Sequence, residues 1–270
     1  MSQTLGELGT RFFAFVQMRN LDVVRTGDVV RELGITESQE RCLLSRLAKR
    51  NLVVRVQRGV YQVPQKLPVG GKWSPGAFRL LQSLMQERQA NWQLCGPNAF
   101  NRYGFSEQMP NRFYVYNDCL SGKRVMGTTE LTFIKVGDER LGDTESWTTP
   151  DGVTVKCSSR LRTLVDAVYD WSRFGSLPQA YYWITEEIRC QPDVTEKLIR
   201  VTKKYGNTGT IRRIGKILEG CNVPQNLLNQ LRKSLPRTTA FIPLVPTQPK
   251  RGTLDQSWGI IDNRSDMEER

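Results

Sequence analysis

Histidine is absent from this chain of 270 residues. Its absence excludes Ser-His-Asp and Cys-His nucleophilic sites, and it also excludes metal sites built on histidine ligands. Any enzyme here would depend on carboxylates, lysine or tyrosine. No two of the six cysteines have a C-x-x-C spacing; they are Cys42, Cys95, Cys119, Cys157, Cys190 and Cys221. We interpret them as scattered reduced thiols, not as a disulfide framework or a zinc site, and we expect no cofactor.

Long hydrophobic runs are also missing. No unbroken aliphatic or aromatic run exceeds the length of Phe12–Val16, whereas a membrane-spanning helix needs about 20 apolar residues. The N-terminus has neither the basic start nor the apolar core of a secretory signal. We therefore expect a cytoplasmic protein without a membrane anchor.

The charge of the chain is strongly positive and unevenly distributed. The net charge is +12, which favours polyanionic partners, with nucleic acid first and anionic membranes second. Residues 1–65 carry ten basic and six acidic side chains, and residues 195–252 carry twelve basic and two acidic ones. The residues between these two segments are nearly neutral. At roughly 100–200 residues per domain, the length suggests two domains.

The N-terminal residues show the pattern of two helices. Apolar side chains recur at spacings of three and four over residues 4–19, which predicts the first helix. A short extended stretch follows. We expect Thr26 to cap the second helix and Gly34 to lie just past its end.

A third helix and a hairpin follow directly. The sequence Thr36-Glu37-Ser38-Gln39 is a capping box, so the third helix should begin there and run to about Arg50. Only residues 34–36 separate it from the second helix, as in a helix-turn-helix. Residues 52–56 and 61–63 are strand-like around a turn. Residues 1–65 are therefore predicted to form a winged helix-turn-helix that binds DNA.

The rest of the chain is predicted to form a second domain, so that the fold class is α+β. A Pro- and Gly-rich linker at 66–73 precedes a larger mixed α/β C-terminal domain at 74–262, which ends in basic helices, and then an acidic tail at 263–270. Helices are expected at 74–88, 160–171, 177–188, 195–204, 210–219 and 224–235. Strands are expected at 92–95, 112–116, 131–136, 153–156 and 257–261.

The third helix should carry the DNA-binding face. Leu43, Leu44 and Leu47 must face the core, which leaves small residues near the start of the opposite face and cations towards its end. Small side chains let a helix enter the major groove, and Arg or Lys reaches phosphates or guanine edges. The predicted DNA-binding residues are Ser38, Gln39, Arg41, Ser45, Arg46, Lys49, Arg55 and Arg58. The alternative is a solvated basic face in a winged helix that binds proteins.

Two helices of the C-terminal segment show a second basic pattern. Their cations fall on stripes opposite the apolar positions, and we expect a second nucleic-acid-contacting face. Its residues are Lys197, Arg200, Lys204, Arg212, Arg213 and Lys216. An ordinary solvated face is the alternative, because charge runs are usually just solvated.

Several motifs resemble the AbiEi family of antitoxins from type IV toxin–antitoxin systems. The stretch from Leu44 to Pro64 resembles the winged helix of that family. Further segments resemble it in the same order, namely Leu94–Phe100, Tyr103–Phe105, Pro110–Tyr116, Ser159–Asp166, Tyr205–Asn207, Arg213–Glu219 and Trp258–Asn263. The resemblance thus covers most of the chain.

The resemblance implies a particular biological role. It implies a transcriptional repressor that autoregulates its operon at inverted repeats in double-stranded DNA. It also implies that the C-terminal domain counteracts a nucleotidyltransferase-like toxin encoded beside it, in an abortive-infection system of phage defence. The antitoxin need not touch the toxin directly in such systems.

An enzymatic role is disfavoured by the carboxylate pattern. Restriction-type nucleases commonly use carboxylates with a D/E-x-K step to hold Mg²⁺, and no such step is present. Arg162 and Asp166 lie four residues apart and can pair on one helix face. We interpret this pair as structural and the protein as a non-enzyme, with a DNA-reading nuclease as the less favoured alternative.

Overall fold

The computed structural model describes residues 5–67, 73–237 and 240–264. The chain divides into two compact units. Unit 1 contains the residues up to 92 together with 111–136 and 147–155, and unit 2 contains 93–110, 137–146 and the residues from 156 onward. Both units are described below, each by itself.

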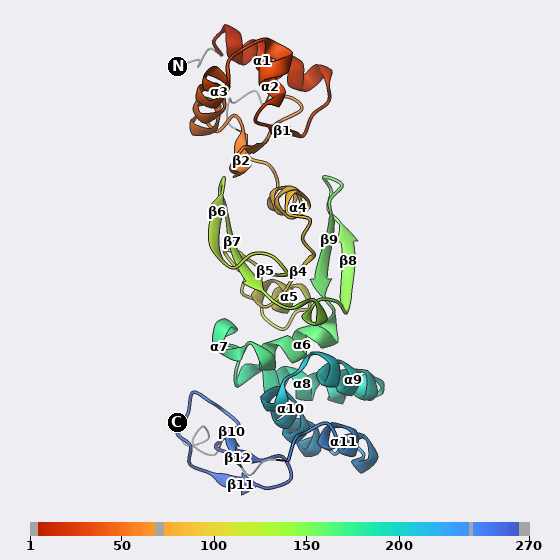
Figure 1. Ribbon diagram of the computed structural model, residues 1–270. Helices are drawn as coiled ribbons and strands as arrows, with labels where there is room; N and C mark the ends of the chain where they lie inside the picture. The colour runs from red at the N-terminus through yellow and green to blue at the C-terminus, as the bar shows by residue number, and fades with distance from the viewer. Residues whose placement is uncertain (1–4, 68–72, 238–239, 265–270) are drawn as a thin grey trace. The chain divides into compact units, whose positions relative to one another are not determined.

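Unit 1 begins with an N-terminal module, residues 5–67, of three helices and a small sheet (Figure 1). Its elements are α1 (Glu7–Met18), β1 (Val23–Arg25), α2 (Asp28–Leu33), α3 (Glu37–Lys49), β2 (Val54–Gln57) and β3 (Val60–Gln62). The strands are antiparallel in the order β1-β3-β2. Phe12, Leu43, Leu44 and Leu47 are buried in a common core, so the apolar faces of α1 and α3 meet as their periodicity predicts.

The remainder of unit 1 contains one complete helix and three complete strands. They are α4 (Ala77–Glu87), β5 (Phe113–Asn117), β6 (Gly122–Met126) and β7 (Thr129–Lys135). Strand β7 pairs in parallel with β5 and antiparallel with β6. Arg25 forms an ion pair with Glu87 of α4, and the Ser83 hydroxyl bonds the buried Gln62 side chain. The N-terminal module is therefore joined to α4 by side-chain contacts.

A six-stranded sheet has the strand order β6-β7-β5-β4-β9-β8. Its other three strands are β4 (Trp92–Leu94), β8 (Thr144–Thr148) and β9 (Thr154–Ser158). Strand β4 runs parallel to β9, with Leu94 opposite Cys157.

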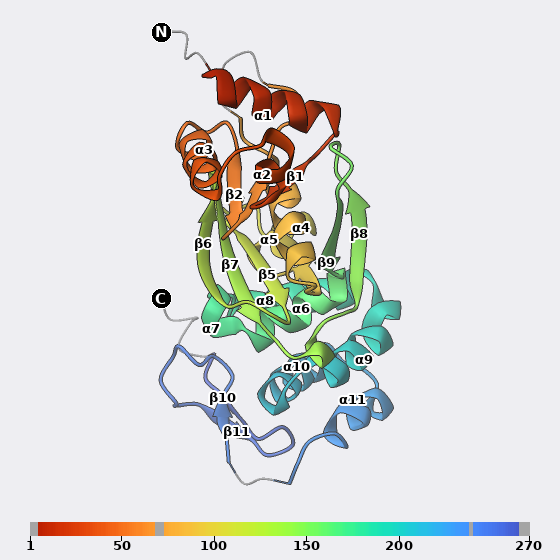
Figure 2. The ribbon, with the colours of Figure 1, turned by 45° about the horizontal axis from the view of Figure 1, so that its top comes forward.

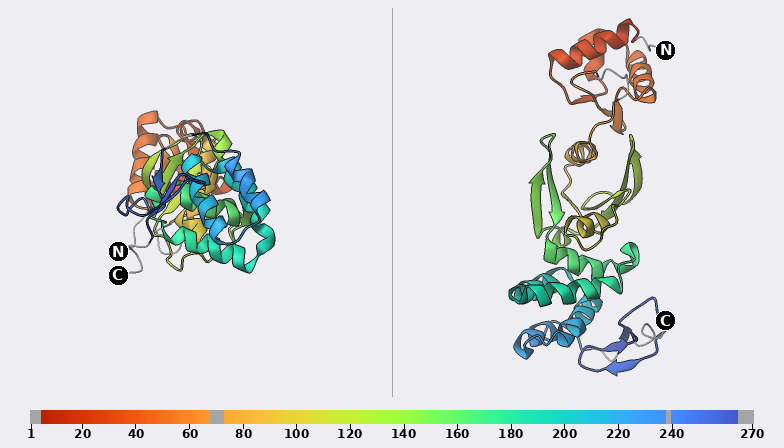
Figure 3. Two further views of the ribbon diagram at one scale, coloured as in Figure 1. Left: turned by 90° about the horizontal axis from the view of Figure 1, so that it is seen from below. Right: turned by 180° about the vertical axis from the view of Figure 1, so that it is seen from behind.

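Unit 2 is mainly helical, as Figures 1 and 2 show. Its helices are α5 (Pro97–Arg102), α6 (Arg160–Tyr169), α7 (Trp171–Phe174), α8 (Gln179–Cys190), α9 (Thr195–Tyr205), α10 (Thr208–Gly220) and α11 (Gln225–Arg232), with 3-10 turns at Asp138–Arg140 and Pro192–Val194. A small sheet of β10 (Ile242–Pro243), β12 (Ile260–Asp262) and β11 (Thr253–Asp255) lies beside α10 (Figure 3). The Trp258 ring packs so closely against Gly215 that a Cβ atom at position 215 would collide with the ring.

The coarse expectations from the sequence are confirmed. The structure is mixed α and β, with N-terminal helices and a larger α/β body. The capping box of Thr36 and Gln39 is present, and Gly34 ends α2. No helix in the described ranges is long and apolar enough to cross a membrane. The predicted linker and acidic tail fall mostly outside the described residues, and the domain boundaries stay a prediction.

Candidate nucleic-acid interface

The outer face of α3 is exposed along its whole length. Leu43, Leu44 and Leu47 are buried, and the side chains of Ser38, Arg41, Ser45, Arg46 and Lys49 all reach solvent. Gln39 is exposed as well, but its side-chain carbonyl accepts the Thr36 backbone N–H at 2.8 Å. The structure therefore places the predicted α3 residues on one surface, with Gln39 engaged in the helix cap.

A buried carboxylate joins α3 to the start of α2. Glu40 is only 1% exposed, and both of its carboxylate oxygens accept the Gly27 N–H at 2.9 Å. Its Oε1 also accepts the Val29 N–H at 3.1 Å. These amides are among those that the first turn of α2 leaves without a partner, and the negative charge faces the positive end of the helix. Glu40 therefore fixes the geometry between the two helices.

This arrangement corrects one prediction. Thr26 was expected to cap α2, but Gly27 is the N-cap residue, with a φ of 100°, and no side chain of its own caps the helix. Thr26 instead contacts the hairpin: its N–H donates to the Gly59 carbonyl at 2.8 Å. The sequence does contain a signal for the real cap, because Glu40 is a charged residue on the apolar side of α3.

The β2–β3 hairpin carries the remaining predicted residues. Arg55 and Arg58 are exposed, and Gly59 has a φ of 79°, which an L side chain would strain. A Cβ at Gly59 would approach the Thr26 hydroxyl to 2.8 Å. The close contact between Thr26 and Gly59 thus holds the hairpin tip, and Arg58 beside it, against the turn that precedes α2.

The outer face of α3 and the hairpin enclose a hollow of about 460 Å³. Three guanidinium groups line it, those of Arg41, Arg55 and Arg58, together with Ser45 and the carboxylate of Glu37. Among the described residues, Arg46, Lys49 and Arg58 have no ion pair with a carboxylate. Arg58 lines the hollow, whereas Arg46 and Lys49 lie on the exposed face of α3 outside it. Exposed cations without a carboxylate partner are suited to phosphate oxygens.

The α9 part of the second basic face is also exposed. Lys197, Arg200 and Lys204 project to solvent and line a hollow of about 330 Å³, together with Asp143 and Tyr205. The Lys204 ammonium lies 5.0 Å from the centre of the Tyr205 ring. The predicted stripe of cations therefore exists on α9.

The α10 part of that face is not exposed, and the prediction needs correction there. Arg212 is 5% and Arg213 9% exposed, and each donates to a backbone carbonyl, of Ala240 and of Pro243 respectively. Lys216 forms a 2.7 Å ion pair with Asp255. The segment that contains β10 and β11 supplies these acceptors, so the cations hold the C-terminal sheet against α10 and are not offered to a polyanion.

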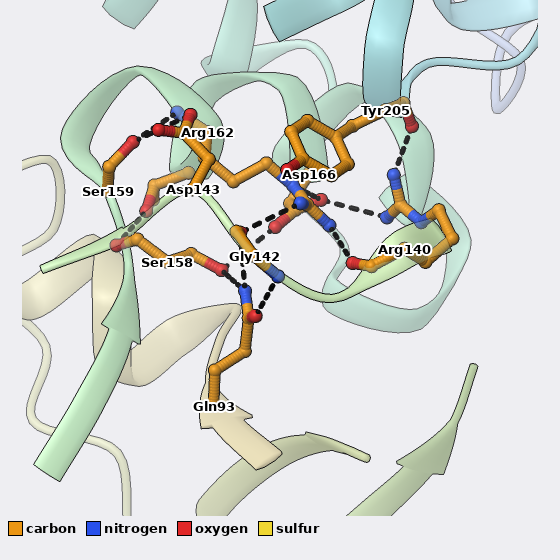
Figure 4. Close-up of polar contacts among 10 residues, drawn as sticks. Gln93, Arg140, Gly142, Asp143, Ser158, Ser159, Arg162, Asp166 and Tyr205 are labelled. Atoms are coloured by element: carbon orange, nitrogen blue, oxygen red, sulfur yellow. Dashed lines mark hydrogen bonds and ion pairs between the residues drawn. The ribbon is translucent and has the colours of Figure 1, made fainter. Parts of the chain in front are cut away.

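A buried polar network, drawn in Figure 4, connects α6 with the end of α9. The Asp166 carboxylate is fully buried and accepts Arg162 Nε at 2.8 Å, Arg140 at 2.9 Å and the Ser158 hydroxyl at 3.1 Å. The Arg162 guanidinium also lies 3.8 Å from the centre of the Tyr205 ring. The pair of Arg162 and Asp166 is thus structural, as the sequence analysis favoured.

A second layer of this network connects different elements. Gln93 of β4 donates to the Ser158 hydroxyl at 2.9 Å and accepts the Gly142 N–H at 2.8 Å. Ser159 caps α6 and donates to Asp143 at 3.1 Å. The guanidinium groups of Arg140 and Arg162 share the Asp166 carboxylate, and Asp143 supplies a second carboxylate, so the charges within the network balance.

The described residues hold little that resembles a catalytic centre. They contain no cluster of three or more His, Cys, Asp or Glu side chains able to hold a metal ion. Burial raises the pKa of Cys157 to about 12, which disfavours the reactive thiolate. The exposed polar surfaces of α3, the hairpin and α9 are therefore the stronger candidates for a functional site.

Comparison with known families matches residues 14–64 to the family described as transcriptional regulator, AbiEi antitoxin. The matched segment includes α2, α3 and the hairpin, so the resemblance inferred from the sequence is confirmed over these residues. Among solved structures, the crystal structure of the RV2827C protein from Mycobacterium tuberculosis is similar, with a TM-score of 0.61 and 15% identity. The match covers 97% of this chain and 93% of that chain, which shows a shared fold. The comparison with curated proteins gives no match.

Proposed function

We propose that this protein is a DNA-binding transcriptional repressor and that its N-terminal module is a winged helix-turn-helix. In this proposal α3 enters the major groove and the β2–β3 hairpin is the wing. The observation that carries it is the exposed outer face of α3, where small side chains lie near the start and cations lie towards the end. Arg55 and Arg58 on the hairpin extend the same positive surface. The match of residues 14–64 to a family of transcriptional regulators supports the same role.

The proposal predicts specific binding to the DNA upstream of the protein's own gene. In a mobility-shift assay at physiological salt, this duplex should be preferred over a random duplex. The double variant Arg46→Ala, Lys49→Ala should weaken binding and lower the salt slope by up to about 0.9 for each phosphate that the variant no longer neutralises. Arg19→Ala is the control, because Arg19 is exposed but already paired with Glu32 at 3.4 Å. Equal affinity of the wild-type chain for both duplexes would contradict the proposal.

We extend the proposal to an antitoxin role within a type IV system. Residues 14–64 match a family of AbiEi antitoxins, and the resemblance implies a nucleotidyltransferase-like toxin encoded beside this gene. In that role the protein represses its own operon at inverted repeats in the cytoplasm. Co-expression with the neighbouring gene should relieve growth arrest, and co-purification would decide whether the two proteins touch.

The α9 cations are proposed as a second contact to the DNA backbone. Lys197 and Arg200 are three residues apart, and Arg200 and Lys204 four, so the stripe extends about 10 Å along the helix. That length matches about three successive phosphate-to-phosphate steps along one strand, at roughly 3.4 Å of helix axis each. The second face is now limited to α9, because Arg212 and Arg213 of α10 are buried and Lys216 is paired with Asp255.

A further inference from the structure

One exposed acidic side chain lies within the otherwise basic surface of α3 and the hairpin, whereas Glu40, which also lines the hollow, is only 1% exposed. Glu37 is the first residue of α3, and its side chain is 79% exposed. It lines the same hollow as Arg41, Arg55 and Arg58. An exposed carboxylate on a surface that binds phosphates opposes binding to every sequence alike, since it repels the backbone. If Glu37 takes part in DNA binding, a favourable contact of its carboxylate must offset this repulsion.

Glu37 is joined to Arg41 one helical turn further on. The Arg41 guanidinium lies 3.4 Å from Glu37 Oε2, and its Nε donates to the Glu37 carbonyl at 3.3 Å. Both side chains lie in the first two turns of α3, which are the turns that reach base edges in a helix-turn-helix. The pair therefore presents a donor fork and an acceptor side by side.

The chemistry of the two groups matches one base pair. In the major groove, Arg binds the O6 and N7 acceptors of guanine, and a carboxylate accepts from the N4 amino group of cytosine. Adenine also presents an amino group, but its N7 acceptor beside it would repel a carboxylate. Resting on the function proposed above, we propose that Arg41 and Glu37 select G·C base pairs within the operator, with Arg41 on guanine and Glu37 on cytosine in the same or the next pair.

A purely structural role for Glu37 makes different predictions. An acidic residue in the first turn stabilises a helix through the macrodipole. That role would lower thermal stability on substitution and leave the base preference unchanged. Sequence preference therefore separates the two roles.

The test is selection from a randomised duplex library with the full chain and three variants. The wild-type chain should enrich a motif with G·C at a fixed position. Glu37→Gln should shift the cytosine position towards adenine, because a glutamine amide pairs with adenine N6 and N7, and should bind random duplex more tightly. Arg41→Ala should lose the guanine preference by roughly 5- to 150-fold. Glu32→Gln, which removes an exposed carboxylate of α2, is the control and should keep the motif.

The outcomes separate this inference from the proposed function. If the wild-type chain enriches a motif and Glu37→Gln and Arg41→Ala both enrich that same motif, the inference is wrong and the repressor role stands. If Glu37→Gln only lowers the melting temperature, Glu37 is a helix-stabilising residue and the inference is again wrong. If the wild-type chain enriches no motif at all, the proposed function itself fails.

Discussion

At the scale of single residues, Glu40 has the most consequential position in the N-terminal module. It is a charged side chain in a buried place, and it is tolerated there because its two oxygens receive backbone N–H groups of Gly27 and Val29. Burying a charge without such partners would be strongly unfavourable. The residue thus replaces apolar packing with a directional contact between α2 and α3.

Glu40→Gln should therefore destabilise the module. The amide has one acceptor oxygen and no charge, so amides at the start of α2 lose a partner, at a cost of roughly 1.5–3 kcal/mol. Hydrogen exchange should increase first at the amides of α2, and thermal unfolding of the full chain should begin earlier. Glu32→Gln serves as the matched surface control and should change stability by less than about 0.5 kcal/mol. Unchanged protection of the Gly27 and Val29 amides would contradict this account.

At the scale of elements, α10 shows how closely a helix can approach a neighbouring chain segment. Gly215 lies against Trp258, and a Cβ there would come within 2.2 Å of the indole ring. Arg212, Arg213 and Lys216 then bond the segment that carries the small sheet. The helix and the sheet form one packed layer, in which cations act as structural donors.

Gly215→Ala should disrupt the packing between α10 and the segment that carries the small sheet. The added methyl group collides with the ring of Trp258, and overpacking of this kind costs about 1–3 kcal/mol. Thermal unfolding of the full chain measures the loss. Gly220→Ala is the control within the same helix, because a Cβ at Gly220 has no neighbour within 4 Å, and it should be neutral or slightly stabilising. Equal stability of both variants would contradict the packing argument.

The elements also show which features the sequence could predict. α3 was predictable because its capping box and its leucine spacing are both local. The partners of Arg212 and Arg213 were not, because periodicity cannot distinguish a cation that faces solvent from one covered by a later segment. Strands β6 and β8 were missed since most of their side chains are exposed, which removes the apolar alternation that marks a strand. On the candidate site, the outer α3 residues were correctly predicted to be exposed, and the buried role of Glu40 was missed.

At the scale of the whole molecule, the positive charge falls into two functional classes. Some cations are used internally, such as Arg140 and Arg162 around Asp166. Others remain in solvent on α3, the hairpin and α9. Only the second class is available to a polyanion, so the net charge of +12 overstates the surface available to DNA.

The α9 cations should therefore contribute measurably to DNA affinity. Replacing Lys197, Arg200 and Lys204 with alanine should reduce the slope of log affinity against log salt by up to about 0.9 for each phosphate left without its cation. Base preference should not change, because backbone contacts carry no sequence information. The double variant Arg173→Ala, Arg189→Ala is the control, since both arginines are exposed but paired with carboxylates. An unchanged slope would eliminate the second face.

The division of labour on α3 has a consequence for redesign. The inner side chains Glu40, Leu43, Leu44 and Leu47 hold the helix in place, and Thr36 with Gln39 defines its beginning. The outer positions 38, 41 and 45 contribute neither to the buried core nor to the helix cap. Under the proposed DNA-binding role, exchanging these outer residues alone should therefore change the operator preference and leave the fold of the module intact.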